Sequence, residues 1–161
     1  MMGLPPVRGG GLVKYVLDLA YEQNQMGHKV VLMVPGCYDG NSDIPKIRYK
    51  KWHEFDCYFV VNPLPVTMGR RLSQVEMLYR ACDRSVFFEF LHEVQPDVVH
   101  IHSFMGLYRE FLQVAHELEI RVVFTTHDYY GLCPGTTLFC GKFMLYRGGL
   151  VFMCAMHEGG N

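Results

Sequence analysis

Three stretches of the chain repeat apolar residues at the spacing of an α-helix. Residues 12–26 form the first, and Gly27 follows as a helix stop. The second covers residues 74–94, in one piece or two, and the third follows Ser103, which is placed to cap it. The expected apolar faces are Val13, Val16, Leu17 and Ala20; then Phe87, Leu91 and Val94; then Leu107, Phe111, Val114, Ala115 and Leu118.

Shorter apolar runs lie between these helices and predict strands. Residues 29–34 read as a buried strand closed by Pro35-Gly36, and residues 44–52 and 57–61 are weaker candidates. Two β-branched runs follow, at residues 97–101 and 121–126. Strands alternating with helices predict an α/β fold with a Rossmann-like parallel sheet flanked by helices.

The two ends of the sequence depart from this pattern. A doubly wound domain opens with a strand, yet the first predicted element is a helix, so we expect a truncated first strand and a fragment of a longer protein. Residues 1–130 are expected to form the Rossmann-like domain. Residues 131–161, rich in cysteine, glycine and aromatic residues, are expected to form an irregular extension with a hairpin near residues 138–145.

Composition narrows the classes of protein that fit. The 161 residues, 50% of them hydrophobic, suffice for one domain with a core. A net charge of −1 excludes the electrostatic footprint of a nucleic-acid binder. No window reaches the ~20 apolar residues of a membrane span, which favours a cytoplasmic protein whose six cysteines are reduced thiols or metal ligands.

Gly9-Gly-Gly11 directly precedes the first helix and is a candidate anion site. A glycine-rich turn before a helix N-terminus lets a phosphate approach the backbone N–H groups, and Arg8 stands beside it. The alternative is a flexible turn without a ligand.

Histidines lie at the ends of both β-branched runs. His100 and His102 project to one face of a strand. They could form a metal-binding pair, or His100 could be a core histidine and His102 a histidine that lines a cleft. His127 follows the other run, where it could donate a hydrogen bond to a sugar hydroxyl or a developing negative charge, with Asp128 orienting its ring or capping a following turn. The alternative is a loop histidine beside a turn aspartate, without a ligand. Ligands of open parallel sheets bind beyond the carboxyl ends of the strands, where these residues fall.

The C-terminal part offers a second candidate site. Cys133, Cys140, Cys154 and His157 carry the thiolate and imidazole ligands that zinc prefers, although only the last two have a zinc-knuckle spacing. Packed free cysteines, or a site completed in a longer chain, are the alternatives.

Three segments together resemble the N-terminal domain of GT-B glycosyltransferases of family 4. They are Pro5-Pro-Val-Arg-Gly-Gly-Gly11 with the later Gly27-His-Lys-Val30, then Pro96-Asp-Val-Val-His-Ile-His102, and Thr125-Thr-His-Asp-Tyr-Tyr-Gly-Leu-Cys-Pro134. Residues 36–95 match the family only loosely.

The resemblance implies a retaining transfer of a sugar from a nucleotide-sugar donor to a glycan or lipid-linked acceptor, with no required metal cofactor. It places His127 and Asp128 at the reacting sugar, and Gly9, Gly10, Gly11, His102 and Ser103 around donor or acceptor. The family's C-terminal nucleotide-sugar domain is not found in this sequence, so we expect the chain to be inactive alone. A lipid-linked acceptor implies peripheral association with the inner face of the membrane.

Two other functions fit the same residues. One is a metal-dependent hydrolase using His100, His102, His127 and Asp128, although the sequence lacks the further carboxylates of a two-metal site. The other is a non-catalytic protein that binds a metal or a partner through its cysteine-rich tail.

Overall fold

A computed structural model describes residues 4–65 and 78–128 of the chain. Its elements follow the order α1 (Gly11–Gln25), β1 (Val31–Pro35), β2 (Lys46–Trp52), β3 (Phe55–Val61), α2 (Ser85–Val94), β4 (Val98–Ile101), α3 (Arg109–Glu117) and β5 (Arg121–Phe124). This alternation confirms the predicted α/β fold. The predicted hairpin and the extension over residues 131–161 lie outside the described residues.

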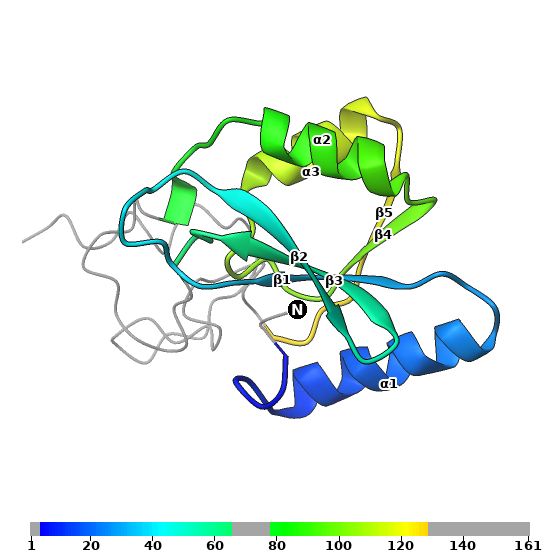
Figure 1. The fold of residues 1–161 in the computed structure, drawn as a ribbon. Coiled ribbons are helices and arrows are strands. Elements are labelled where there is room, and N and C mark those ends of the chain that lie inside the picture. The colour runs from blue at the N-terminus through cyan, green and yellow to red at the C-terminus, as the bar shows by residue number, and fades with distance from the viewer. Residues whose placement is uncertain (1–3, 66–77, 129–161) are drawn as a thin grey trace, which may run out of the picture.

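The strands form two small sheets. β3 lies between β1, which is parallel to it, and β2, which is antiparallel to it. β4 and β5 form a separate parallel pair, with His100 opposite Val123 and Ile101 opposite Phe124. Figure 1 shows α1 on one side of the strands and α2 with α3 on the other, so the domain has three layers.

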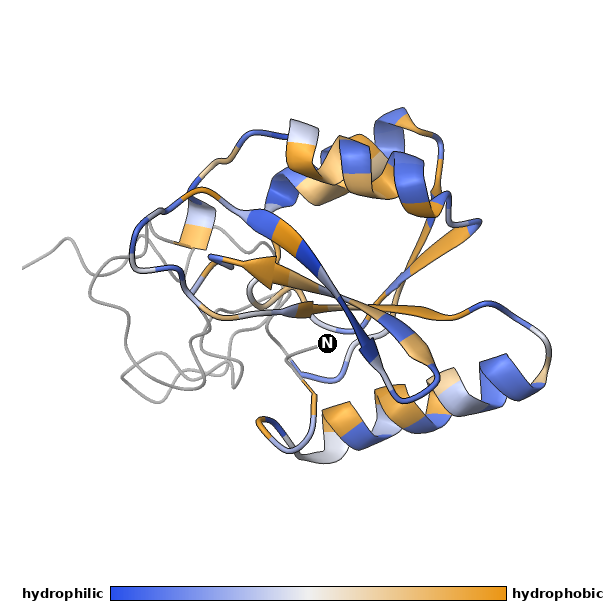
Figure 2. Cartoon of the chain, viewed as in Figure 1, coloured by the Kyte–Doolittle hydropathy of each residue, from blue (hydrophilic) through white to orange (hydrophobic). Residues whose placement is uncertain are grey.

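Each side of the strands has its own apolar core. β3 serves both, because alternate residues of a strand point to opposite faces: Phe55 and Cys57 pack toward α1, and Val60 packs toward α2 and α3. Figure 2 shows α1 with its hydrophobic side toward the strands and its hydrophilic side outward. The predicted inner face of α1 is confirmed, since Val13, Val16, Leu17 and Ala20 are all buried.

The second predicted helix, over residues 74–94 in one piece or two, is interrupted, because residues 80–84 are not helical and α2 begins at Ser85. Its predicted start lies outside the described residues. Asp83 forms a turn just before α2, because its carboxylate accepts a hydrogen bond from the backbone N–H of Ser85 at 2.9 Å. The inner face of α2 agrees with the prediction, with Phe87 and Leu91 buried.

The predicted role of Ser103 as a helix cap was wrong. Its hydroxyl accepts a hydrogen bond from the N–H of Met105 at 3.1 Å, which closes a local turn, and α3 begins only at Arg109. Gly106 lies in this turn with a φ of 79° and passes close to Pro35 at the end of β1. The turn therefore needs a glycine, and the helix starts later than its apolar spacing suggests.

Candidate functional site

The site is built first on β4 and the residue after it: His100 lies in β4, and His102 follows the end of the strand directly. The rings of His100 and His102 lie 4.0 Å apart between centroids, as the two-residue period of a strand predicts. His102 is 8% exposed, whereas His100 is half-buried. The shared face is confirmed, although His102 is buried more deeply than a simple cleft-lining residue.

The pairing of β4 with β5 adds the segment that follows β5. His100 Nε2 lies 2.8 Å from the hydroxyl oxygen of Thr125, which gives this ring nitrogen a hydrogen-bond partner. His102 Nδ1 lies 3.1 Å from Nε2 of His127, within hydrogen-bond distance. His127 itself is exposed. Two histidines from segments 25 residues apart therefore form one hydrogen-bonded pair at the carboxyl edge of this sheet.

Tyr15 of α1 completes the cluster. Its ring centroid lies 5.9 Å from that of His102 and 4.9 Å from that of His127, both edge-on. Tyr15 is one helical turn beyond Gly11, so these contacts bring the start of α1 to the histidines. Sequence reasoning missed Tyr15, because nothing in the residue pattern shows which side of α1 faces the strand ends.

The glycines at the start of α1 leave their surroundings open. A side chain built on Gly9, Gly10 or Gly11 would meet no atom within 4 Å, and α1 begins without a side-chain cap. Gly10 has a φ of 114°, a conformation that side chains rarely adopt. The backbone at this helix start is therefore exposed, and the anion site expected there stays a prediction.

Burial lowers the pKa of both His102 and His100. Removal from water lowers the pKa of His102 from 6.5 to about 4, and the neighbouring His100 adds to the shift. The pKa of His100 is lowered mainly by burial as well, with a smaller effect of His127. His102 is thus neutral at neutral pH and carries one ring N–H. In its contact with His127, one ring donates and the other accepts.

The predicted metal ligands are not brought together within the described residues. There, no group of three or more His, Cys, Asp and Glu side chains is placed to hold a metal ion. His100, His102 and His127 are neighbours, but through a hydrogen bond and tilted ring contacts rather than as a set of metal ligands, which weakens the hydrolase hypothesis. Asp128 is exposed at the end of the described segment. Cys133, Cys140, Cys154 and His157 lie outside the described residues.

Two of the described cysteines, Cys57 and Cys82, are poor nucleophiles. Burial raises the pKa of the Cys57 thiol to about 11. Burial, with a smaller effect of the Glu110 carboxylate, raises that of Cys82 to about 12. Both remain protonated at neutral pH, so neither supplies a reactive thiolate.

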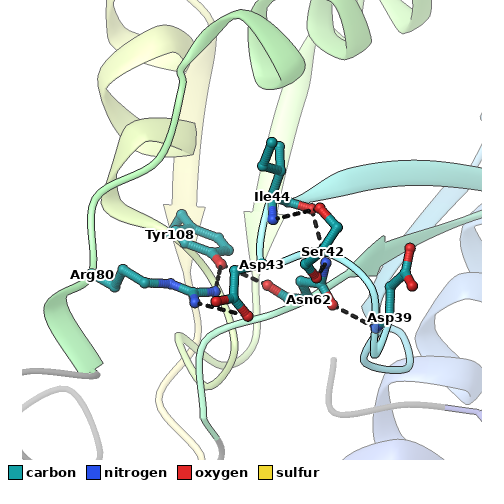
Figure 3. A network of polar contacts seen from close by, with 7 residues as sticks. All are labelled: Asp39, Ser42, Asp43, Ile44, Asn62, Arg80 and Tyr108. Carbon is teal, nitrogen blue, oxygen red and sulfur yellow. Dashed lines mark hydrogen bonds and ion pairs between the residues drawn. The ribbon is translucent and has the colours of Figure 1, made fainter.

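A second polar group, at the end of β3, was not predicted at all. Asn62 is 2% exposed, and its side-chain amide bridges the loop between β1 and β2 (Figure 3). The amide oxygen accepts from the N–H of Asp39 at 2.6 Å, and the amide nitrogen donates to the carbonyls of Ser42 and Ile44 at 2.7 and 2.9 Å. Asn62 therefore fixes this loop at the carboxyl end of the larger sheet.

The same residue connects the loop to α3. The backbone carbonyl of Asn62 accepts a hydrogen bond from the buried hydroxyl of Tyr108 at 2.6 Å. Arg80 donates to that hydroxyl at 2.8 Å and lies 3.7 Å from the carboxylate of Asp43 (Figure 3). Asn62 adopts a positive φ of 55°, a conformation that asparagine tolerates. Because φ cannot be read from a sequence, nothing in the sequence marked this residue.

Comparison with known proteins identifies the family. The model of a family described as Glycosyltransferase Family 4 matches residues 9–148. None of the curated proteins and none of the solved structures compared gives a significant match. The matched range contains the glycine turn, both histidine-bearing segments and Tyr15. The chain belongs to Glycosyltransferase Family 4.

Proposed function

We propose that this domain forms the acceptor-side wall of a retaining glycosyltransferase. In this proposal a sugar passes from a nucleotide-sugar donor to a glycan or lipid-linked acceptor. The observation that carries the proposal is the contact of His102, His127 and Tyr15 at the carboxyl edge of β4 and β5, beside the open glycine start of α1. Ligands of open α/β sheets bind at this edge.

His127 is the proposed contact to the transferred sugar. It is the exposed member of the pair, and its second ring nitrogen, Nδ1, is not the atom that faces His102. If His102 Nδ1–H donates to His127 Nε2, the neutral His127 ring carries its proton on Nδ1 and can donate it to a sugar hydroxyl. His102 then acts as a positioning residue that selects the tautomer and orientation of His127.

The glycine start of α1 is the proposed place for a negatively charged group of the substrates. Gly9, Gly10 and Gly11 are open to a ligand, and a helix N-terminus favours an anion such as a diphosphate. Tyr15 keeps this helix start beside the histidines. Ser103 and Asp128 stay in the proposal as flanking polar groups of the same edge.

Transfer is proposed to require a second domain. The family resemblance implies two Rossmann-like domains that face each other across a cleft, and 161 residues suffice for one. We therefore expect this chain alone to bind substrate weakly and to give no sugar transfer. The described residues contain no helix that is both long and apolar enough to span a bilayer. A lipid-linked acceptor would place the domain at a membrane surface.

The proposal is tested by titrating the chain with UDP-glucose, GDP-mannose and a short oligosaccharide, and comparing wild type with His127→Ala. We expect the variant to lose about five- to tenfold in affinity for at least one ligand, the value of one hydrogen bond. His28→Ala is the matched control, because His28 is an exposed histidine at the opposite end of α1. Equal losses in both variants, or none in His127→Ala, would contradict the proposal.

A further inference from the structure

Arg80 is a partly exposed arginine whose guanidinium is held in place by a buried group. Its Nη2 donates a hydrogen bond to the hydroxyl oxygen of Tyr108 at 2.8 Å. Tyr108 is 0% exposed, and its hydroxyl donates to the backbone carbonyl of Asn62 at 2.6 Å. The core therefore fixes the position of the hydroxyl, and the hydroxyl fixes one corner of the guanidinium (Figure 3).

Most of the hydrogen-bonding capacity of Arg80 is unused within the described residues. A guanidinium has five N–H donors in one plane. In that part of the chain, the Tyr108 hydroxyl is the only acceptor within hydrogen-bond distance of Arg80. Asp43 Oδ1 lies 3.7 Å from Nη1, which makes an ion pair but is too long for a hydrogen bond. The Arg80 side chain is 36% exposed, so its remaining donors can be reached from solvent.

Asp43 is a weak and replaceable partner of Arg80. Its side chain is 96% exposed, and water screens an ion pair of this kind so that it contributes little to stability. The loop that carries Asp43 is nevertheless held in place, because the Asn62 side chain donates to the carbonyls of Ser42 and Ile44 on either side of it. The carboxylate thus stays beside the guanidinium without binding it closely, as a counter-ion that another anion can displace.

The same loop supplies a second donor. Partial burial raises the pKa of Tyr38, and the positive charge of Arg80 opposes this shift, so the phenol hydroxyl lies near the guanidinium. The Tyr38 residue is 62% exposed. A ligand that reaches the N–H groups of Arg80 can therefore reach the Tyr38 hydroxyl as well.

These donors specify the chemistry of the ligand. The planar fork of a guanidinium matches two oxygens of a carboxylate or phosphate group and binds them through parallel hydrogen bonds. A neutral hydroxyl would not compensate the charge of Arg80 and would leave Asp43 in competition for it. An oxyanion does both, because it satisfies the free donors and replaces the Asp43 carboxylate.

The position of Arg80 relates this group to the proposed sugar site. Asn62 directly follows β3, so the polar group lies at the carboxyl end of that strand. Leu64 comes just after it, and its N–H donates to the carbonyl of Gly106, in the turn after β4, at 3.2 Å. The carboxyl ends of the two sheets therefore meet at one edge of the domain.

We propose that Arg80 is the binding residue of an oxyanion site, which takes a phosphate or carboxylate group in exchange for Asp43. The bearer of this group is the acceptor, and this part of the inference rests on the proposed function. The binding of a free anion at Arg80 does not depend on it.

The experiment measures the binding of inorganic phosphate and of acetate to the full chain by NMR titration. Arg80→Gln removes the donor fork, and we expect it to weaken the affinity by about tenfold or more, the value of hydrogen bonds to a charged group. Asp43→Asn removes the competing charge and should strengthen the affinity by about three- to fivefold. The two variants break the same ion pair, yet they should shift the affinity in opposite directions. The anion that binds more tightly identifies the group as phosphate or carboxylate.

A second ion pair on the surface provides matched controls. Arg84 pairs with Glu117, and Arg84→Gln and Glu117→Gln should leave the affinity for both anions unchanged. Equal losses in Arg80→Gln and Arg84→Gln would show a general attraction to positive charge and would overturn the inference. Unchanged or weaker binding in Asp43→Asn would overturn it too, because a purely structural ion pair gives that result.

Two further variants keep the test decisive. Arg80→Lys retains the charge without the planar fork, and it serves if Arg80→Gln does not fold. It should lose affinity by several-fold, and wild-type affinity in this variant counts against the site. His127→Ala should bind both free anions as wild type does, so a failure of the proposed sugar site and a failure of this site are read separately.

Discussion

At the scale of single residues, His102 has the most informative environment. Burial and the nearby His100 ring keep it neutral, and its Nδ1 faces His127. The sequence predicted that His100 and His102 share a face, because this follows from strand geometry alone. It did not predict the hydrogen bond to His127, which depends on the register in which β5 pairs with β4.

The pKa of His102 leads to a prediction about pH. Its folded-state pKa of about 4 lies below the ordinary value of 6.5, so the unfolded chain binds more protons between these values. The free energy of unfolding should therefore fall as the pH drops from 6.5 toward 4. In an NMR titration the His102 ring signals should change near pH 4, and a midpoint near 6.5 would show that the ring is not desolvated.

A matched variant isolates this contribution. His102→Gln removes the titrating group and keeps a polar side chain of comparable length. Its free energy of unfolding should depend less steeply on pH between 4 and 6.5 than that of wild type, as measured by chemical denaturation. Parallel curves for the two proteins would assign the acid sensitivity to other groups.

Asn62 supports a prediction about stability. Asn62→Ala removes three part-buried side-chain hydrogen bonds to the loop between β1 and β2 and leaves a gap at a residue that is itself 2% exposed. We expect a loss of about 3 kcal/mol in the free energy of unfolding. Asn41→Ala, at an exposed asparagine of the same loop, should change it by less than about 0.5 kcal/mol. Comparable losses in the two variants would contradict the role of Asn62.

At the scale of elements, apolar spacing predicted the inner faces of all three helices. The boundaries were less predictable, because α2 begins where Asp83 accepts a backbone hydrogen bond and α3 begins after a turn that uses Ser103 and Gly106. These boundaries are set by individual side-chain contacts. The spacing of apolar residues within a helix does not reveal these contacts.

The turn after β4 can be tested at Gly106. A Cβ atom there would lie 2.9 Å from Cγ of Pro35, and the φ of 79° disfavours any side chain. We expect Gly106→Ala to lower the free energy of unfolding by about 2 kcal/mol or more. Gly40→Ala is the control, since a side chain there meets no atom within 4 Å. Equal melting temperatures for both variants would show that the turn tolerates a side chain.

At the scale of the whole molecule, the layered α/β fold followed from the alternation of strands and helices. The sequence predicted only some of the residues that make up the candidate site. His102 and His127 were placed at one edge by the rule for parallel sheets, whereas Tyr15 and Asn62 needed the packing of α1 and the path of a loop. The glycine turn and the histidines, distant in sequence, belong to one edge because α1 begins there.

The central claim is that this edge, formed by His102, His127 and Tyr15, binds the sugar substrates. The most direct test is to record the histidine ring signals of the chain by NMR while UDP-glucose, GDP-mannose and an oligosaccharide are added in turn. The account predicts that the His102 and His127 signals shift together with at least one ligand, with the His127 proton on Nδ1, while His28 and His53 stay unchanged. Shifts confined to other histidines, or His127 ring signals that do not shift with any of the ligands, would contradict it.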